Sequence, residues 1–154
     1  MLSRLKRYTG VVALAAIIVL VVIGVMRAVL ASSSPLVVVE GNSMIPTLYN
    51  GDLVLIQKPA PSELHRGDII VYRSPVTGRL VIHRVVKINV EHGSYFYITK
   101  GDNNPVDDVA QGLEPPRGIP YEDILGRVVC VHTSYGDAPL RIPYLGLLTQ
   151  LVRG

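Results

Sequence analysis

The stretch Leu80-Val81-Ile82-His83-Arg84-Val85-Val86-Lys87-Ile88-Asn89-Val90 decides the fold class of this chain. It is rich in β-branched residues and has an alternating first part, which is typical of a β-strand. Five further runs have the same character: Leu36–Val39, Leu53–Gln57, Ile69–Tyr72, Tyr95–Thr99 and Ile124–Val131. Turn-forming Gly, Asp, Asn and Pro residues separate these runs. We therefore predict a small, mainly β domain without a long amphipathic helix before its C-terminal stretch.

The N-terminal stretch has a different character. Residues Gly10–Met26 carry no charge, and after Arg27 the apolar run resumes up to Ala31. About 20 apolar residues suffice to span a bilayer as a helix, so we expect a transmembrane anchor over residues 10–31. The basic tail of residues 1–9 predicts a cytoplasmic N-terminus and an extracytoplasmic or lumenal domain after residue 31.

A cleaved secretory signal peptide is the competing interpretation of this stretch, with Val29-Leu30-Ala31 as a tolerable cleavage site. The apolar run exceeds the usual length of about 7–15 residues in such peptides, and Arg27 lies near its end. These two features favour an uncleaved anchor.

The formal charge of +3 comes from the N-terminal part of the chain. From Ser32 onward, 11 Lys and Arg residues stand against 12 Asp and Glu residues. No basic surface is therefore left for phosphates, and we expect no nucleic-acid partner. The length of 154 residues allows one small domain, which we place at residues 32–139.

The last stretch, residues 140–154, is apolar but too short to span a membrane as a helix. It either lies in the membrane interface, which we prefer, or packs on the core. Cys130 is the single cysteine, within an apolar run, and we expect it to be buried and inert. The four scattered histidines lack zinc-site spacing, so we predict neither a metal nor a cofactor.

Three features of the sequence suggest nucleophilic catalysis. Ser43 lies in a turn-like context between Gly41 and Pro46, and His83 lies inside a predicted strand that would hold its imidazole in a fixed direction. The loop of residues 99–108 adds carboxylates. A serine hydroxyl needs an adjacent base, which a third group usually orients. Taken singly, each feature is more often a plain turn serine, a strand histidine or a polar loop.

Together, these residues resemble the ordered motifs of type I signal peptidases, over roughly residues 10–131. The motifs that carry the resemblance are Ser43-Met44-Ile45-Pro46-Thr47-Leu48, Gly67-Asp68-Ile69-Ile70-Val71-Tyr72-Arg73, Ile82-His83-Arg84-Val85-Val86 and Gly101-Asp102-Asn103-Asn104 with Asp108 beyond. Bacterial members have a lysine base where this chain has His83. The resemblance is therefore to the archaeal and endoplasmic-reticulum branch, and it implies a signal-peptidase-like β domain behind one transmembrane helix.

The resemblance also implies roles for individual residues. Ser43 matches the nucleophile and His83 the general base, while Asp102 and Asp108 match the two acidic positions of the last motif. We favour Asp108 as the residue that orients His83, with Asp102 as a supporting partner. Spacing alone does not separate them, and Asp107 adds a third carboxylate beside Asp108.

Oxyanion stabilisation is expected to differ from that of many bacterial members, which carry a serine two positions before the nucleophile. Here that residue is Gly41, so backbone N–H groups must stabilise the oxyanion, that of Ser43 first among them. We expect Asn42 to assist and Met44 to contribute to the oxyanion or substrate-binding region.

The expected function is signal peptidase I activity, a serine endopeptidase that removes signal peptides from secreted preproteins after small residues. Expected partners are signal-peptide-bearing preproteins, membrane lipid and additional subunits. A self-cleaving repressor-like peptidase is disfavoured, because it predicts a lysine base, a DNA-binding domain and a soluble chain. A catalytically silent, membrane-anchored β module that only binds a partner is the remaining alternative.

Overall fold

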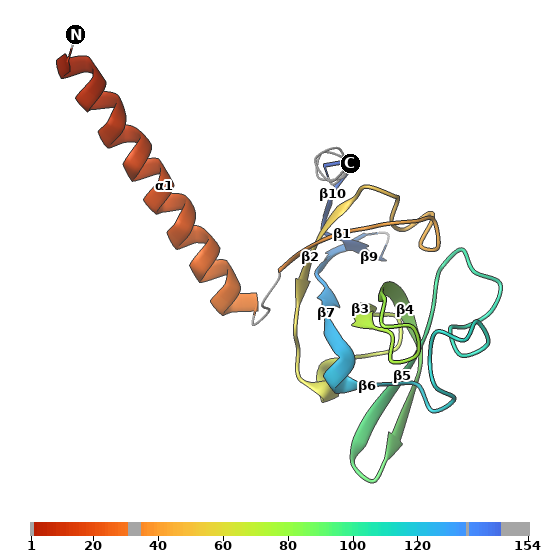
Figure 1. Ribbon diagram of the computed structural model, residues 1–154. Helices are drawn as coiled ribbons and strands as arrows, with labels where there is room; N and C mark the ends of the chain where they lie inside the picture. Colours follow the sequence, from red (N-terminus) through yellow and green to blue (C-terminus); the bar gives the residue numbers. More distant parts are fainter. Residues whose placement is uncertain (1, 31–34, 135, 146–154) are drawn as a thin grey trace.

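The computed structural model describes residues 2–30, 35–134 and 136–145 and consists of one long helix followed by a β domain (Figure 1). The elements are α1 (Leu2–Leu30), β1 (Leu36–Val38), β2 (Leu53–Gln57), β3 (Ile69–Arg73), β4 (Leu80–Glu91), β5 (Ser94–Lys100), β6 (Ile119–Pro120), β7 (Ile124–Val128), β8 (Cys130–Thr133), β9 (Gly136–Pro139) and β10 (Arg141–Ile142). Two short 3-10 turns, η1 (Pro61–Glu63) and η2 (Tyr121–Asp123), precede β3 and β7. The predicted mainly β domain behind an N-terminal helix is confirmed.

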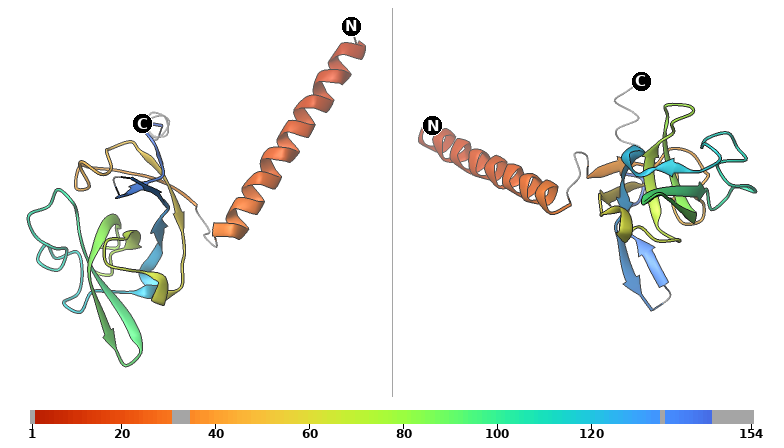
Figure 2. Two further views of the ribbon diagram at one scale, coloured as in Figure 1. Left: turned by 180° about the vertical axis from the view of Figure 1, so that it is seen from behind. Right: turned by 90° about the horizontal axis from the view of Figure 1, so that it is seen from below.

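The main sheet is antiparallel and has eight strands. Seven of them follow the order β1-β2-β7-β3-β4-β5-β6, and β10 pairs with β2 off this path. Strands β8 and β9 form a separate hairpin, which projects from the domain in the right-hand view of Figure 2. Strands β3, β4 and β5 thus lie side by side, and the long hairpin of β4 and β5 brings the acidic loop after β5 back toward β3.

Strand β3 is buried on both faces, as its uninterrupted apolar run allows. Ile69 and Val71 pack into one core cluster and Ile70 and Tyr72 into another. Because successive strand residues point to opposite faces, these two clusters lie on the two sides of the strand. The buried centre of the domain is therefore β3 and its neighbours, and His83 lies in the neighbouring strand β4.

Helix α1 extends away from the β domain (Figure 1). Most of its described apolar side chains are exposed, Val12 and Leu20 among them. Within the described part of the chain, no helix combines the length and the apolarity needed to cross a lipid bilayer. An N-terminal helix is therefore confirmed, described up to Leu30, whereas the membrane anchor over residues 10–31 stays a prediction. Ala31 of the cleavage site considered at Val29-Leu30-Ala31 lies outside the described residues, and so do residues 32–34 of the link after it.

The strand predicted over Ile124–Val131 is wrong in its C-terminal part. Strand β7 pairs with β2 and β3, whereas β8 begins at Cys130 and pairs with β9, so the chain changes partners around Val129. As a result Cys130 is exposed, and the prediction that its thiol is buried is also wrong. Periodicity alone could not locate this change, because residues on both sides of Val129 are apolar.

The predicted C-terminal segment begins within the sheet. Arg141 of β10 lies opposite Val54 of β2, and its Nη1 donates to Oδ2 of the buried Asp52 at 2.6 Å. The first residues after 139 are therefore part of the β domain. Residues 146–154 lie outside the described residues, so the interfacial role preferred for residues 140–154 stays a prediction.

Candidate active site

The alternation of side chains along the strands brings three polar side chains to one face of the sheet. His83 of β4 lies opposite Ile70 of β3, and Thr99 of β5 lies opposite Val85 of β4. Directly opposed residues point to the same face, and so do residues two apart in one strand. His83, Thr99 and Tyr72 therefore share a face. All three side chains are buried in the domain.

Ser43 lies in the turn that follows β1, and apolar residues behind it fix this turn. Met44 and Leu48 are fully buried in the core, and the Leu48 N–H donates to the Met44 carbonyl at 2.9 Å. From the other side, the Asn103 N–H donates to the Ser43 carbonyl at 2.8 Å. The hydroxyl is thus held at a half-buried position between the core and the loop after β5.

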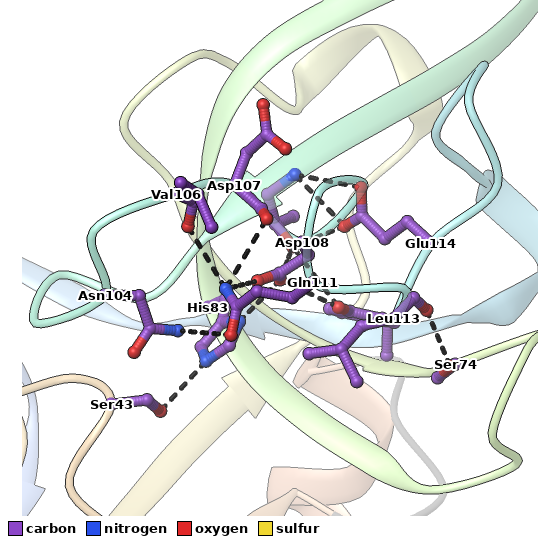
Figure 3. A network of polar contacts seen from close by, with 12 residues as sticks. Ser43, Ser74, His83, Asn104, Val106, Asp107, Asp108, Gln111, Leu113 and Glu114 are labelled. Carbon is purple, nitrogen blue, oxygen red and sulfur yellow. Dashed lines mark hydrogen bonds and ion pairs between the residues drawn. The ribbon is translucent and has the colours of Figure 1, made fainter.

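A continuous hydrogen-bonded path joins Ser43, His83 and Asp108 (Figure 3). Ser43 Oγ lies 2.9 Å from His83 Nε2, and His83 Nδ1 lies 2.5 Å from Asp108 Oδ2. With Nδ1–H donating to the carboxylate, Nε2 is the acceptor and the serine hydroxyl donates to it. His83 is 4% exposed and Asp108 is fully buried, so only the serine end of the path meets solvent.

Asp108 is held by donors on both of its oxygens. Oδ2 accepts from His83, from Thr99 Oγ1 at 2.5 Å and from the Tyr72 hydroxyl at 2.9 Å, and Oδ1 accepts from Gln111 Nε2 at 3.2 Å. Burial by itself would raise the pKa of Asp108, but the hydrogen bonds from His83 and Thr99 outweigh it and lower the pKa. The carboxyl group is therefore ionised at neutral pH and fixed in direction.

Asp102 has a different set of partners. Arg84 donates to it through Nε at 2.8 Å and Nη2 at 2.7 Å, and Thr47 Oγ1 donates at 2.5 Å. Burial acts to raise the pKa of Asp102, but the hydrogen bonds from Arg84 and Thr47 lower it. Arg84 adjoins His83 in β4 and so points to the opposite face. Asp102 thus ties the loop after β5 to β4 and to the turn that contains Ser43.

Gly101 lies where the loop passes closest to this turn. A Cβ at this residue would lie 2.7 Å from the Ser43 carbonyl oxygen and 2.6 Å from Asn104 Nδ2. Beyond it, Asp107 Oδ1 accepts from the Ala110 N–H at 2.9 Å and does not bond His83. Asp107 therefore caps a local turn, whereas Asp108, one residue later, points inward.

The residues expected near the oxyanion have separate positions. Gly41 has φ +91° and donates its N–H to Asn50 Oδ1 at 3.1 Å, so this N–H is already engaged. The exposed Asn42 receives, on its carbonyl, a hydrogen bond from Asn103 Nδ2 at 3.2 Å. The side chain of Met44 belongs to the core. Within the described residues the Ser43 N–H makes no hydrogen bond, which leaves it open to a developing oxyanion.

The arrangement joins a serine hydroxyl, an imidazole and a buried carboxylate, which is the combination of groups that nucleophilic catalysis by a serine requires. Among the described residues, no group of three His, Cys, Asp or Glu side chains could hold a metal ion.

Tyr72, Thr99 and Gln111 were missed by the sequence reasoning, although all three contact Asp108. Tyr72 and Thr99 were assigned to predicted strands. However, an apolar strand pattern does not indicate which polar side chains share a buried face. Gln111 carried no signal, because it lies in a loop whose path the sequence does not specify.

The antiparallel β domain thus places a serine, a buried histidine and a buried aspartate in one hydrogen-bonded path. The chain itself belongs to the signal peptidase family, because the model "Signal peptidase, peptidase S26" matches residues 9–92, more than half of its length. The match includes Ser43 and His83 and ends before the acidic loop. The family predicted from the four motifs is confirmed.

Similar proteins are catalytic subunits of signal peptidase complexes. The SEC11C subunits of human and dog are 31% identical over 122 residues, which cover 79% of this chain and 58% of each relative. The sec11 subunit of Schizosaccharomyces pombe is 35% identical over 133 residues, covering 75% of this chain and 66% of the relative. This chain thus spans less than two thirds of the length of these relatives.

Proposed function

We propose that this protein is a signal peptidase, a serine endopeptidase that removes N-terminal signal peptides from preproteins after small residues. The observation that carries the proposal is the path from Ser43 Oγ through His83 to the buried Asp108. A chance serine–histidine contact would not need a buried carboxylate with four donors behind it. Membership in the signal peptidase family points to the same chemistry.

In the proposed mechanism, His83 takes the proton of Ser43 as the hydroxyl attacks the scissile carbonyl. Asp108 keeps His83 in the tautomer with Nδ1–H and stabilises the imidazolium that forms. The open Ser43 N–H donates to the oxyanion, and the neighbouring Asn42 assists in stabilising it. His83 then returns the proton to the leaving amine, and water repeats the sequence on the acyl-enzyme.

Substrate binding is proposed to extend the sheet. Among the described strands, β1 pairs with β2 alone, so its other edge is free, and Ser43 follows five residues after its end. An extended substrate could add to this edge through main-chain hydrogen bonds, with side-chain pockets setting specificity. Small residues at the first and third positions before the cut are part of this proposal.

We also propose that α1 anchors the catalytic domain to a membrane. The described part of the helix exposes apolar side chains along its length, and residues 1–9 are basic without an acidic residue. We therefore propose that the N-terminus lies in the cytoplasm and the β domain outside the cell or in a lumen. A tethered enzyme and a substrate lodged in the same membrane meet at a raised effective concentration.

Additional subunits are proposed partners, because the relatives are named as subunits of signal peptidase complexes. Membrane lipid is the second proposed partner, through α1. Preproteins that carry signal peptides are the proposed substrates.

Cleavage of a preprotein by the purified full-length protein in detergent or vesicles tests the proposal. The protein should release the mature product, and Ser43→Ala or His83→Ala should lower the rate by roughly 10⁴-fold or more. Ser62→Ala and His65→Ala are matched controls, because both side chains are exposed and lie outside the site. Binding of preprotein without cleavage by the wild type would favour the silent β module.

A further inference from the structure

Glu114 is a buried carboxyl group that the proposed mechanism does not use. It lies in the loop between β5 and β6, is 3% exposed and lies beside Asp108 in Figure 3. Its Oε1 is 2.5 Å from Thr99 Oγ1, and the Thr99 N–H lies 3.1 Å and 3.3 Å from its two oxygens. The same Thr99 Oγ1 is 2.5 Å from Asp108 Oδ2. One hydroxyl group therefore lies between two buried carboxyl groups.

The number of protons limits how these contacts form. Oxygen atoms 2.5 Å apart require a shared proton, and a threonine hydroxyl has only one to donate. If both carboxyl groups were ionised, one of the two short contacts would join two acceptors without a hydrogen between them. A second proton must therefore reside on Asp108 or on Glu114.

The surroundings of the two groups decide between them. Asp108 accepts from His83, Tyr72 and Gln111 besides Thr99, which favours its ionised form. Among the described contacts, Glu114 has Thr99 as its hydrogen-bond partner, through the N–H and the hydroxyl. Burial, with the nearby charge of Asp108, raises the pKa of Glu114 to about 8, although the Thr99 hydroxyl opposes this. At neutral pH the second proton is on Glu114.

We propose that Glu114 is a positioning residue whose carboxylic acid donates to Thr99 Oγ1 and so commits the Thr99 hydroxyl proton to Asp108. The chain of donors then runs from Glu114 through Thr99 to Asp108, which holds His83. Glu114 contacts neither Ser43 nor a substrate in this arrangement. The proposal deepens the proposed function, because the residue that it positions is the acid of that same site.

Loss of the Glu114 proton would reverse this arrangement. Two carboxylates would then compete for the single Thr99 hydroxyl proton, and the negative charges would repel each other across it. The titratable groups that face Glu114 are Asp108 from the loop and Tyr72 from β3, with His83 of β4 behind Asp108. Asp108 would lose its short donor, and the orientation of His83 would loosen.

The test compares the pH dependence of preprotein cleavage in the full-length wild type and Glu114→Gln. Glutamine is neutral at every pH, and its amide can donate to Thr99 Oγ1 while its carbonyl accepts the Thr99 N–H. The wild-type kcat/KM should fall on the alkaline side with a midpoint near pH 8, and Glu114→Gln should lack this fall. Glu122→Gln, at an exposed carboxylate, should keep the wild-type profile.

A second measurement does not depend on cleavage. In histidine-labelled Ser43→Ala protein, the Nδ1–H resonance of His83, assigned by its loss in His83→Ala, should shift with the same midpoint. Adding Glu114→Gln should remove this transition. The inference is overturned if the transition or the alkaline fall persists in Glu114→Gln. A Glu114-dependent transition, together with a wild type that cleaves no preprotein, would contradict the proposed function and still support the positioning role of Glu114.

Discussion

Arg84 binds Asp102 in a bidentate ion pair, with Nε 2.8 Å from Oδ1 and Nη2 2.7 Å from Oδ2. This pairing uses both carboxylate oxygens, and Asp102 makes no hydrogen bond to His83 among the described contacts. Such bidentate pairs fix the geometry as well as the charge. Asp102 is therefore paired with Arg84, whereas Asp108 is hydrogen-bonded to the imidazole of His83.

The two acidic positions should respond differently to neutralisation. Asp108→Asn should lower kcat by roughly 10³- to 10⁴-fold, because the amide favours the wrong imidazole tautomer. Asp102→Asn should keep activity within about tenfold while destabilising the fold by about 1–2 kcal/mol, because the Arg84 pair is only partly buried. Preprotein cleavage and urea unfolding measure the two effects. An active Asp108→Asn with a dead but well-folded Asp102→Asn would reverse the assignment.

The pH dependence of stability gives a second view of Asp102. Its pKa in the folded protein is lowered below the ordinary value of 3.8, against the effect of burial, by Arg84 and Thr47. A lowered folded pKa contributes stability that is complete above the unfolded pKa and is lost as the pH falls through the folded value. The stability difference between wild type and Asp102→Asn should thus stay constant from pH 7 to 5 and shrink below 3.8. A difference that grows in acid would contradict the lowered pKa.

The contribution of Glu114 to folding stability should change with pH in the opposite direction. Its folded pKa of about 8 lies above the ordinary value of 4.5, so the stability that its proton contributes is lost as the pH rises between these values. Glu114→Gln does not titrate. The stability of Glu114→Gln relative to wild type should therefore increase from pH 5 to 8 and then level off, as urea unfolding would measure. A constant difference over this range would mean that the carboxyl group is already ionised at pH 5.

Tyr72→Phe should weaken the support of Asp108 without removing it. The variant loses the donor at 2.9 Å from Oδ2, while His83 and Thr99 still donate to the same oxygen. Hydrogen bonds to charged groups contribute roughly 1.5–3 kcal/mol, so kcat should fall by roughly 10- to 150-fold. KM should change little, because Tyr72 is buried away from the solvent-facing serine. A variant that raises KM alone would place Tyr72 in substrate binding.

Gly101→Ala should disturb the site more than the fold. The added Cβ would lie 2.7 Å from the Ser43 carbonyl oxygen, a backbone atom that must then move. Shifts of about 1 Å at a nucleophile can cost about 10²-fold in rate. We expect this loss in kcat, measured beside thermal unfolding, with Gly24→Ala in α1 as the control because its Cβ would meet nothing. Full activity in Gly101→Ala would show that the turn tolerates displacement.

The parts of the fold that could be predicted are those with a local signal. Strands such as β2 and β4 matched their predicted runs within a residue, because alternation and β-branched content depend on neighbours in sequence. The break at Val129 was missed, and so were β6, β9 and β10, which have few residues and weak patterns. Short edge strands form because a partner strand is near, which a local pattern cannot reveal.

The sequence by itself determined the family, the mainly β class and the serine and histidine that the structure brings together, because these depend on ordered motifs. Only the tertiary structure decided which carboxylate is hydrogen-bonded to His83. His83 and Arg84 point to opposite faces of β4. The loop after β5 places Asp108 beside His83 on one face and Asp102 beside Arg84 on the other. The same folding placed Thr99 between Asp108 and Glu114. Proximity in space and burial set the charge of these groups. The spacing of residues along the chain specifies neither.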